Sequence, residues 1–274
     1  MSKNICNFLI NFFLSLFVFL YICIIIVSIT IFNNRYIKNK LEENNFYDLT
    51  YFDIKKSFEN YTMQSGLELD ILENLITKER VINDINKKID SFYDKKIIEI
   101  DNNFIIEELD KRINKILNEK NKILNDDEKK SITKYEEVIG DCYKNGILYG
   151  KDLKLENEIF QKISIFCIIG ILILNIILII INMNFLKNLI FWGINLLFSG
   201  ILCIFIRLFI ERKIQNILFF DAKFSKLLVN TLNEIILYFY KFGIISCIIG
   251  SWGIIVGIIF ILKNKSKKSI VNDN

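Results

Sequence analysis

The side chains in this sequence that would perform chemistry are mostly carboxylates, and several of them occur as adjacent pairs. Two neighbouring carboxylates are a starting point for general acid–base catalysis or for Ca²⁺ binding. Each pair lies beside lysines on a charged helical face or at a helix cap, which is typical of a solvated surface. The pairs are Glu42/Glu43, Glu107/Glu108, Asp126/Asp127 and Glu136/Glu137.

The sequence contains no histidine, and this excludes several reaction classes at once. A histidine metal site, a histidine general base and Ser–His or Cys–His nucleophile pairs all need that residue. The sequence also lacks a glycine-rich dinucleotide or phosphate loop, an HExxH motif and a calcium loop. We therefore expect a protein that is not an enzyme, with no catalytic residue, no cofactor and no metal ion.

The six cysteines do not form a redox or metal motif. No two of them make a CxxC, and only Cys142 falls in a polar part of the chain. A single cysteine cannot form a disulfide within its own domain, so no disulfide framework is predicted. We interpret all six as small apolar packing residues. They are Cys6, Cys23, Cys142, Cys167, Cys203 and Cys247.

Four apolar runs are long enough to cross a bilayer, for which about 20 residues are needed. The first run is longer than the core of a typical signal peptide and no clear cleavage site follows it, so an uncleaved anchor is favoured over a signal peptide. The turn between the second and third runs is short and predicts a helical hairpin. The runs cover residues 12–32, 159–181, 189–210 and 242–262, with the turn at 182–188.

Residues 33–158 differ from the apolar runs, with 22 Lys/Arg and 27 Asp/Glu. Apolar residues recur there every three or four positions, which predicts amphipathic helices. About 125 residues can bury a core. The fold class that we predict is therefore an all-α membrane protein with four transmembrane helices and an α-helical extracytoplasmic domain inserted between spans 1 and 2.

Helix starts within this domain are predicted from capping residues. Thr77 is expected to cap a helix, and Ser65 with Glu68 matches the capping-box spacing for a short helix that ends at Leu75. Asp101 or Asn102 would cap a third helix, and Asp126 or Asp127 a fourth. The residues from Tyr51 to Met63 form a further helical candidate, and those from Arg35 to Asn44 are expected to continue the first membrane helix.

Polar and small residues inside the spans are candidates for helix packing. Asn175 and Asn195 lie in adjacent spans, where a hydrogen bond between them would tie the hairpin together; this is favoured over a transport site. Gly243, Gly250, Gly253 and Gly257 lie along one face of the fourth span, and the last two form a GxxxG motif. Such a face permits close approach of another helix, either within the bundle or between two copies of the chain.

The stretch 211–241 is amphipathic, with apolar residues every three or four positions. Two placements remain open for it: a helix lying in the headgroup region, or packing against the helical domain. Arg207, which precedes the stretch, is followed by Glu211 and Arg212 and is expected to extend to the membrane interface.

Four spans place both termini on one side of the membrane. The basic tail 263–274 favours the cytoplasm for that side, together with the short tail 1–11. Lysines and arginines after spans 1 and 3 count against this orientation, yet a short tail before a long anchor favours it. The basic residues occur with similar numbers of acidic ones, so nucleic acid is not expected as a partner. The expected partners are the lipid bilayer and an envelope or membrane protein, or a second copy of the chain.

A resemblance to known proteins rests on the residues between Asn60 and Tyr93. There the chain resembles uncharacterised four-span membrane proteins of low-GC Gram-positive bacteria, a similarity that implies one anchor, an external helical domain and three further spans, and implies no activity. The layout is also similar to that of the mechanotransmitting permease subunits of some ABC systems. The residues concerned are Tyr61, Ser65, Gly66 and Leu67, the start Thr77–Glu79, and Asp84 with Ile85.

These observations lead to one functional expectation and one alternative. We expect a non-enzymatic sensing, scaffolding or assembly component of the cell envelope. The alternative is a permease-like subunit of an ABC-type system that couples its external domain to a cytoplasmic ATPase.

Overall fold

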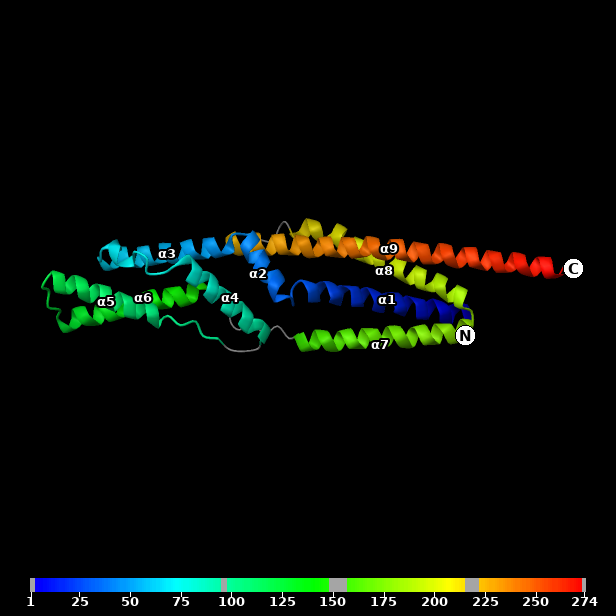
Figure 1. Ribbon diagram of the computed structural model, residues 1–274, viewed down its shortest axis with the longest axis horizontal. Helices are drawn as coiled ribbons and strands as arrows, with labels where there is room; N and C mark the ends of the chain where they lie inside the picture. The colour runs from blue at the N-terminus through cyan, green and yellow to red at the C-terminus, as the bar shows by residue number, and fades with distance from the viewer. Residues whose placement is uncertain (1–2, 95–97, 148–156, 215–221, 273–274) are drawn as a thin grey trace. The chain divides into compact units, whose positions relative to one another are not determined.

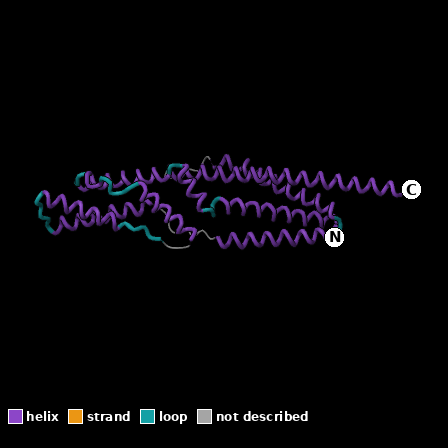
Figure 2. The backbone as a smooth tube through the Cα atoms, viewed as in Figure 1, coloured by secondary structure: helices purple, strands orange, loops and turns teal. Residues whose placement is uncertain are grey.

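The computed structural model describes residues 3–94, 98–147, 157–214 and 222–272, and every regular element in these ranges is a helix (Figure 2). This confirms the all-α prediction. The elements are α1 (Lys3–Ile29), α2 (Asn34–Glu43), α3 (Phe46–Ser65), the 3-10 helix η1 (Leu69–Leu72), α4 (Lys78–Asp94), α5 (Asn103–Glu119), α6 (Asp126–Ile147), α7 (Asn157–Asn182), α8 (Phe185–Ile214) and α9 (Ala222–Asn272).

The chain forms two compact units, which are described separately. The first, here called the membrane unit, comprises Met1–Asn33 and Glu156–Asn274 and holds α1, α7, α8 and α9 (Figure 1). Each of these helices contains a segment long and apolar enough to cross a membrane. The second, the helical domain, comprises Asn34–Leu155. The four candidate spans are Asn4–Ile29, Ile159–Asn182, Phe185–Glu211 and Lys223–Lys263.

The helices of the membrane unit pack through aromatic and aliphatic side chains. The rings of Phe17 and Phe166 lie 5.7 Å apart, which joins α1 to α7. On the other side of α1, a buried cluster of Ile26, Cys203 and Ile235 joins it to α8 and α9. Large side chains such as Trp252 (71% exposed) remain on the outer surface, where lipid would contact them.

The turn between α7 and α8 is shorter than the sequence suggested. Met183 adopts a positive φ of 50°, and α8 begins two residues later. The Oδ1 atom of Asn184 accepts hydrogen bonds from the backbone N–H groups of Leu186 (3.0 Å) and Lys187 (3.3 Å), and this caps the helix. Two residues therefore suffice to reverse the chain.

Several predicted helix starts in the helical domain are confirmed. The Thr77 hydroxyl accepts a hydrogen bond from the N–H of Arg80 at 3.2 Å, so Thr77 caps α4. The Asp101 carboxylate accepts one from the N–H of Asn103 at 2.9 Å, at the start of α5. The candidate helix beginning at Tyr51 lies within α3.

Three local predictions are wrong. Ser65 ends α3 instead of starting a helix, because Gly66 takes a left-handed φ of 73° there and only the short η1 follows. The cap of α6 is Asn125, which exchanges hydrogen bonds with Glu128 in a capping box. The first membrane helix does not continue to Asn44, since α1 ends at Ile29 and α2 begins at Asn34.

The stretch 211–241 falls partly outside the described residues, at 215–221. Before this gap α8 continues to Ile214, and after it α9 runs without a break from Ala222 through the fourth span to Asn272. Within α9, Ile235 is buried in the cluster with α1 and α8, and Phe239 and Phe242 pack against it. This part of the stretch therefore belongs to the core of the membrane unit.

Candidate functional site

Neutral polar side chains connect α1 to α8 inside the membrane unit. Asn7, Asn11 and Ser15 are spaced four apart and share one face of α1. The Nδ2 atom of Asn195 donates to Oδ1 of Asn11 at 2.9 Å. The Ser199 hydroxyl donates to the carbonyl oxygen of Ser15 at 2.8 Å. We call this set of residues, with Asn182 and Asn188, the polar seam.

The polar seam extends to the turn between α7 and α8. The Nδ2 atom of Asn7 donates to Oδ1 of Asn182 at 3.0 Å, and Nδ2 of Asn182 donates to Oδ1 of Asn188 at 3.2 Å. Asn188 is fully buried. Sequence analysis missed Asn7 because it assigned residues 1–11 to a tail, whereas α1 begins at Lys3. The four-residue spacing of Asn7, Asn11 and Ser15 in the sequence could have indicated that Asn7 belongs to this polar face.

The two amides that were expected to pair across the hairpin have different partners. Asn195 bonds to Asn11, as described above. Asn175 instead donates from Nδ2 to the carbonyl oxygen of Ile171 in its own helix, at 2.8 Å, and its Oδ1 has no hydrogen-bond partner. Asn195 therefore ties α8 to α1, and Asn175 ties no helices together.

A cavity of about 350 Å³ lies between α1, α7 and α8. Its lining is largely apolar, with two carboxamides and one indole as the polar groups. None of the residues that line it is charged. They are Leu14, Val18, Asn175, Trp192, Asn195 and Leu196.

Glycine allows α8 and α9 to approach with their backbones in contact. A Cβ atom on Gly250 would lie 2.6 Å from the carbonyl oxygen of Gly193, and one on Gly243 would lie 2.8 Å from that of Gly200. Distances this short are not tolerated between a side chain and a backbone. Gly193 and Gly200 of α8 are seven residues apart, as Gly243 and Gly250 of α9 are, and the sequence analysis did not single out the two glycines of α8.

The predicted GxxxG motif contributes unevenly to this contact. A Cβ atom on Gly253 would lie 3.6 Å from the Cα atom of Gly193, an ordinary van der Waals distance. A Cβ atom on Gly257 would lie 2.5 Å from Cγ1 of Ile190, which is a flexible side chain. The closest backbone contacts are therefore at Gly243 and Gly250.

Arg207 is held inside the membrane unit by two groups. Its Nε lies 3.3 Å from Oε2 of Glu211, and its guanidinium stacks 4.4 Å from the centre of the Tyr240 ring. The expected extension of Arg207 to the membrane interface stays a prediction. The ring of Tyr240 adds a contact between α8 and α9 that the sequence did not indicate.

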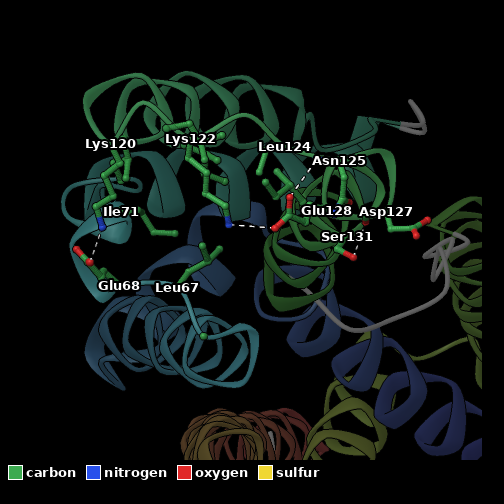
Figure 3. Close-up of a pocket in the computed structure, with 15 residues that line it drawn as sticks. Leu67, Glu68, Ile71, Lys120, Lys122, Leu124, Asn125, Asp127, Glu128 and Ser131 are labelled. Atoms are coloured by element: carbon green, nitrogen blue, oxygen red, sulfur yellow. Dashed lines mark hydrogen bonds and ion pairs between the residues drawn. The ribbon is translucent and has the colours of Figure 1, made fainter.

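The helical domain contains a cleft of about 440 Å³ where the end of α5, the start of α6 and η1 meet (Figure 3). Two ion pairs cross its rim: Lys120 with Glu68 and Lys122 with Glu128, each at 3.0 Å. The floor consists of aliphatic side chains from all three elements and from the turn before η1. These are Leu67, Ile71, Ile113, Ile116, Leu117 and Ile132.

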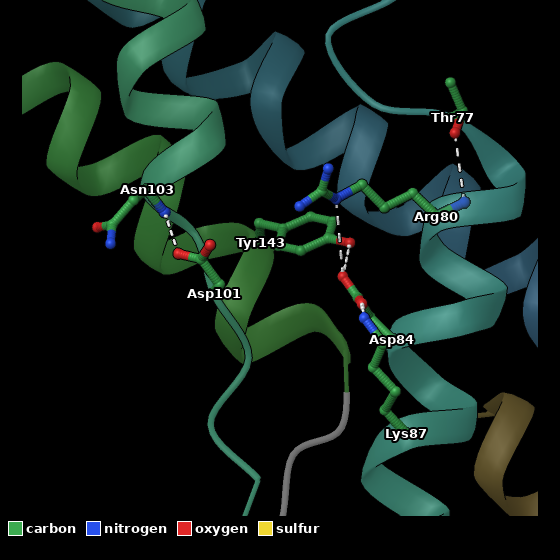
Figure 4. Close-up of polar contacts among 7 residues, drawn as sticks. All are labelled: Thr77, Arg80, Asp84, Lys87, Asp101, Asn103 and Tyr143. Carbon is green, nitrogen blue, oxygen red and sulfur yellow. Dashed lines mark hydrogen bonds and ion pairs between the residues drawn. The ribbon is translucent and has the colours of Figure 1, made fainter.

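A second polar cluster of the helical domain surrounds Asp84, which is 5% exposed (Figure 4). The hydroxyl of Tyr143 donates to Oδ2 of Asp84 at 2.7 Å, and Nζ of Lys87 donates to Oδ1 at 3.1 Å. Arg80 lies 3.9 Å from the same carboxylate and stacks on Phe104 at 3.3 Å. Burial and the neighbouring carboxylate raise the pKa of Tyr143 well above its ordinary value. The cluster joins α4 to α6 and α5.

Glu136 does not lie on a solvated face, and that part of the prediction is wrong. Its side chain is 5% exposed, and its Oε1 has no hydrogen-bond partner among the described residues. Burial raises its pKa from 4.5 to about 7, and the nearby carboxylate of Asp110 acts in the same direction. Its neighbour Glu137 is exposed, as predicted.

Within the described residues, no three His, Cys, Asp or Glu side chains are grouped as they would be around a metal ion. All six cysteines are free. Comparison with family models, with curated proteins and with solved structures gives no match. The functional interpretation therefore depends on the geometry of the two units.

Proposed function

We propose that this chain is a non-enzymatic, multi-pass membrane protein that acts as a sensing, scaffolding or assembly component of the cell envelope. Its helical domain lies outside the cytoplasm, and both termini lie in the cytoplasm. The bilayer surrounds the membrane unit, and an envelope protein binds the helical domain.

The observation that carries this proposal is the cleft of the helical domain. Its aliphatic floor is open to solvent, and a volume of about 440 Å³ is in the range of binding pockets. The two lysines at its rim, Lys120 and Lys122, are each paired with a glutamate, so the rim has no excess positive charge to attract nucleic acid. A cleft of this kind suits an apolar segment of another protein.

The buried ionisable groups of the domain support a binding role over a catalytic one. Asp84 is surrounded by Tyr143, Lys87 and Arg80, so its carboxylate serves to join helices. Neither Asp84 nor Glu136 lines the cleft.

The proposal is tested by purifying the full chain from its native membranes in a mild detergent. A stoichiometric envelope protein should co-purify, and Ile116→Glu on the cleft floor should abolish that association. The matched control is Ile123→Glu, because Ile123 is 95% exposed beside the cleft but does not line it. If both variants lose the association equally, or if neither loses it, the envelope protein does not bind in the cleft.

The permease-like subunit remains the second candidate, and one observation favours it. Helix α9 continues to Asn272, beyond the end of the candidate span at Lys263, and so provides a helical extension for a cytoplasmic ATPase. The two-residue turn between α7 and α8 counts against it, since it leaves no room for a coupling helix there. A stoichiometric ATPase in the purified complex would replace our first proposal with this one.

The proposed orientation has its own test. A reporter enzyme that works only in the cytoplasm, fused after Asn274, should be active. A reporter that is active there only outside the cytoplasm would reverse the assignment of sides.

A further inference from the structure

The cavity of the membrane unit contains a polar atom that protein groups do not satisfy. Asn195 lines it and is 3% exposed. Its Nδ2 is used by Asn11, whereas no described residue donates to its Oδ1. An acceptor that lines an apolar cavity without a protein donor is available to a hydrogen-bond donor on an occupant.

Two further polar atoms beside the cavity lack hydrogen-bond partners. They are Oδ1 of Asn175, an acceptor, and Nε1 of Trp192, a donor. Both are covered by neighbouring atoms. Oδ1 of Asn195 is therefore the acceptor that remains for an occupant of this apolar cavity.

The chemistry of the lining restricts the occupant. No charged residue lines the cavity, so an ion would be left there without a counter-charge. A hydroxyl group fits, because it donates to the free Oδ1 of Asn195 and carries no charge.

The position of the cavity indicates where such a molecule would enter. At about 1.5 Å per residue, Trp192 lies about 10 Å along α8 from its start at Phe185, and Asn175 lies about as far from the end of α7 at Asn182. Between the cavity and that turn, Asn7 and Asn188 each have a buried atom without a partner, Oδ1 and Nδ2 respectively. Polar groups therefore continue from the α7–α8 turn to the cavity.

We propose that this cavity is a binding site for a small, uncharged, hydroxyl-bearing group that enters from the α7–α8 turn and donates a hydrogen bond to Oδ1 of Asn195. Two sources supply this chemistry: water, and the glycerol hydroxyls of a lipid headgroup.

The experiment uses Trp192 as the reporter. The full chain carrying Trp252→Phe has a single tryptophan at the cavity, and it is reconstituted in bilayers of phosphatidylcholine, whose headgroup has no hydroxyl, or of phosphatidylglycerol. A bound hydroxyl should shift Trp192 emission to the red, and Leu196→Phe, which fills the cavity, should abolish this shift. The matched control is Ile194→Phe, since Ile194 is 43% exposed on the same helix and does not line the cavity.

Each outcome decides the matter. A red shift that Leu196→Phe removes in both lipids supports the site with water as its occupant. The same result in phosphatidylglycerol alone supports a headgroup hydroxyl. If Leu196→Phe and Ile194→Phe leave the emission equally unchanged in both lipids, the cavity is dry and the proposal is overturned. Asn11→Leu, which breaks the Asn195–Asn11 bond without entering the cavity, should leave the shift in place, and its loss there would also overturn the proposal.

Discussion

The membrane unit and the helical domain bury different kinds of polar group. In the membrane unit they are neutral amides and hydroxyls, such as Asn188, Asn195 and Ser199. In the helical domain they include the carboxylates of Asp84 and Glu136. This difference between the two units follows from the solvent that surrounds each of them.

In lipid, two helices gain little from burying apolar side chains against each other, because the lipid tails are equally apolar. Close packing and neutral hydrogen bonds must then hold them, and the glycine contacts of α8 with α9 and the polar seam supply both. In water, apolar burial drives association, and residues such as Ile105 and Leu109 are fully buried in the helical domain. The domain therefore has free energy available to accommodate a buried charge.

The largest effect that would test this comparison is expected at Gly250. Gly250→Leu would place a side chain 2.6 Å from the carbonyl oxygen of Gly193 and should force α8 and α9 apart. We expect it to lower the free energy of unfolding by about 3 kcal/mol or more, measured by denaturant titration in detergent micelles. Gly253→Leu, at a position with ordinary contact distances, should cost clearly less. Equal costs would show that backbone contact does not hold this pair.

The second prediction concerns the pH dependence of the helical domain. The pKa of Glu136 is about 7 in the folded chain against 4.5 ordinarily, so the folded state binds more protons between these values. Stability should therefore fall as the pH rises from about 4.5 through 7, by at most about 3 kcal/mol at about 1.4 kcal/mol per pKa unit. Glu136→Gln should remove this dependence, as followed by unfolding midpoints across pH.

The exposed neighbour is the control for that measurement. Glu137→Gln changes the same charge at an adjacent, exposed position and should leave the pH profile as it is. A profile that is flat in the unaltered chain would contradict a buried, titrating Glu136.

The third prediction tests the charged cluster of the helical domain. Tyr143→Phe removes the hydrogen bond to Oδ2 of Asp84 and leaves a buried carboxylate with one donor fewer. We expect a loss of about 2 kcal/mol in the free energy of unfolding, because hydrogen bonds to charged groups are strong. Tyr61→Phe, at a side chain that is 44% exposed, should have no measurable effect. A similar cost in both variants would show that the cluster does not stabilise the domain.

The smallest effect is expected in the polar seam. Ser199→Ala removes hydroxyl contacts to the carbonyl oxygens of Ser15 and Asn195. Neutral hydrogen bonds between membrane helices contribute about 0.6 kcal/mol on average, so the loss should be well below that of Tyr143→Phe. The control is Ser251→Ala, at a partly exposed position of α9. If Ser199→Ala lowers the free energy of unfolding as much as Tyr143→Phe does, the buried polar groups of the two units do not differ in the way described.

Local structure was predictable where the signal lay in a few adjacent residues. Thr77 caps α4 as expected, since a threonine before an amphipathic run has few alternatives. Ser65 was misjudged because Gly66, which lies between the capping-box residues Ser65 and Glu68, ends α3. The choice between a helix start and a helix end depended on the packing of α3, which adjacent residues do not encode.

The sequence by itself determined the all-α class and the four apolar helices, because both follow from side-chain polarity and period along a single segment. It also excluded chemistry that depends on histidine. Only the tertiary structure decided that Asn195 pairs with Asn11, that Gly193 meets Gly250, and that Glu136 is buried. Each of these depends on which faces of distant segments meet, and the composition of one segment does not specify its partner.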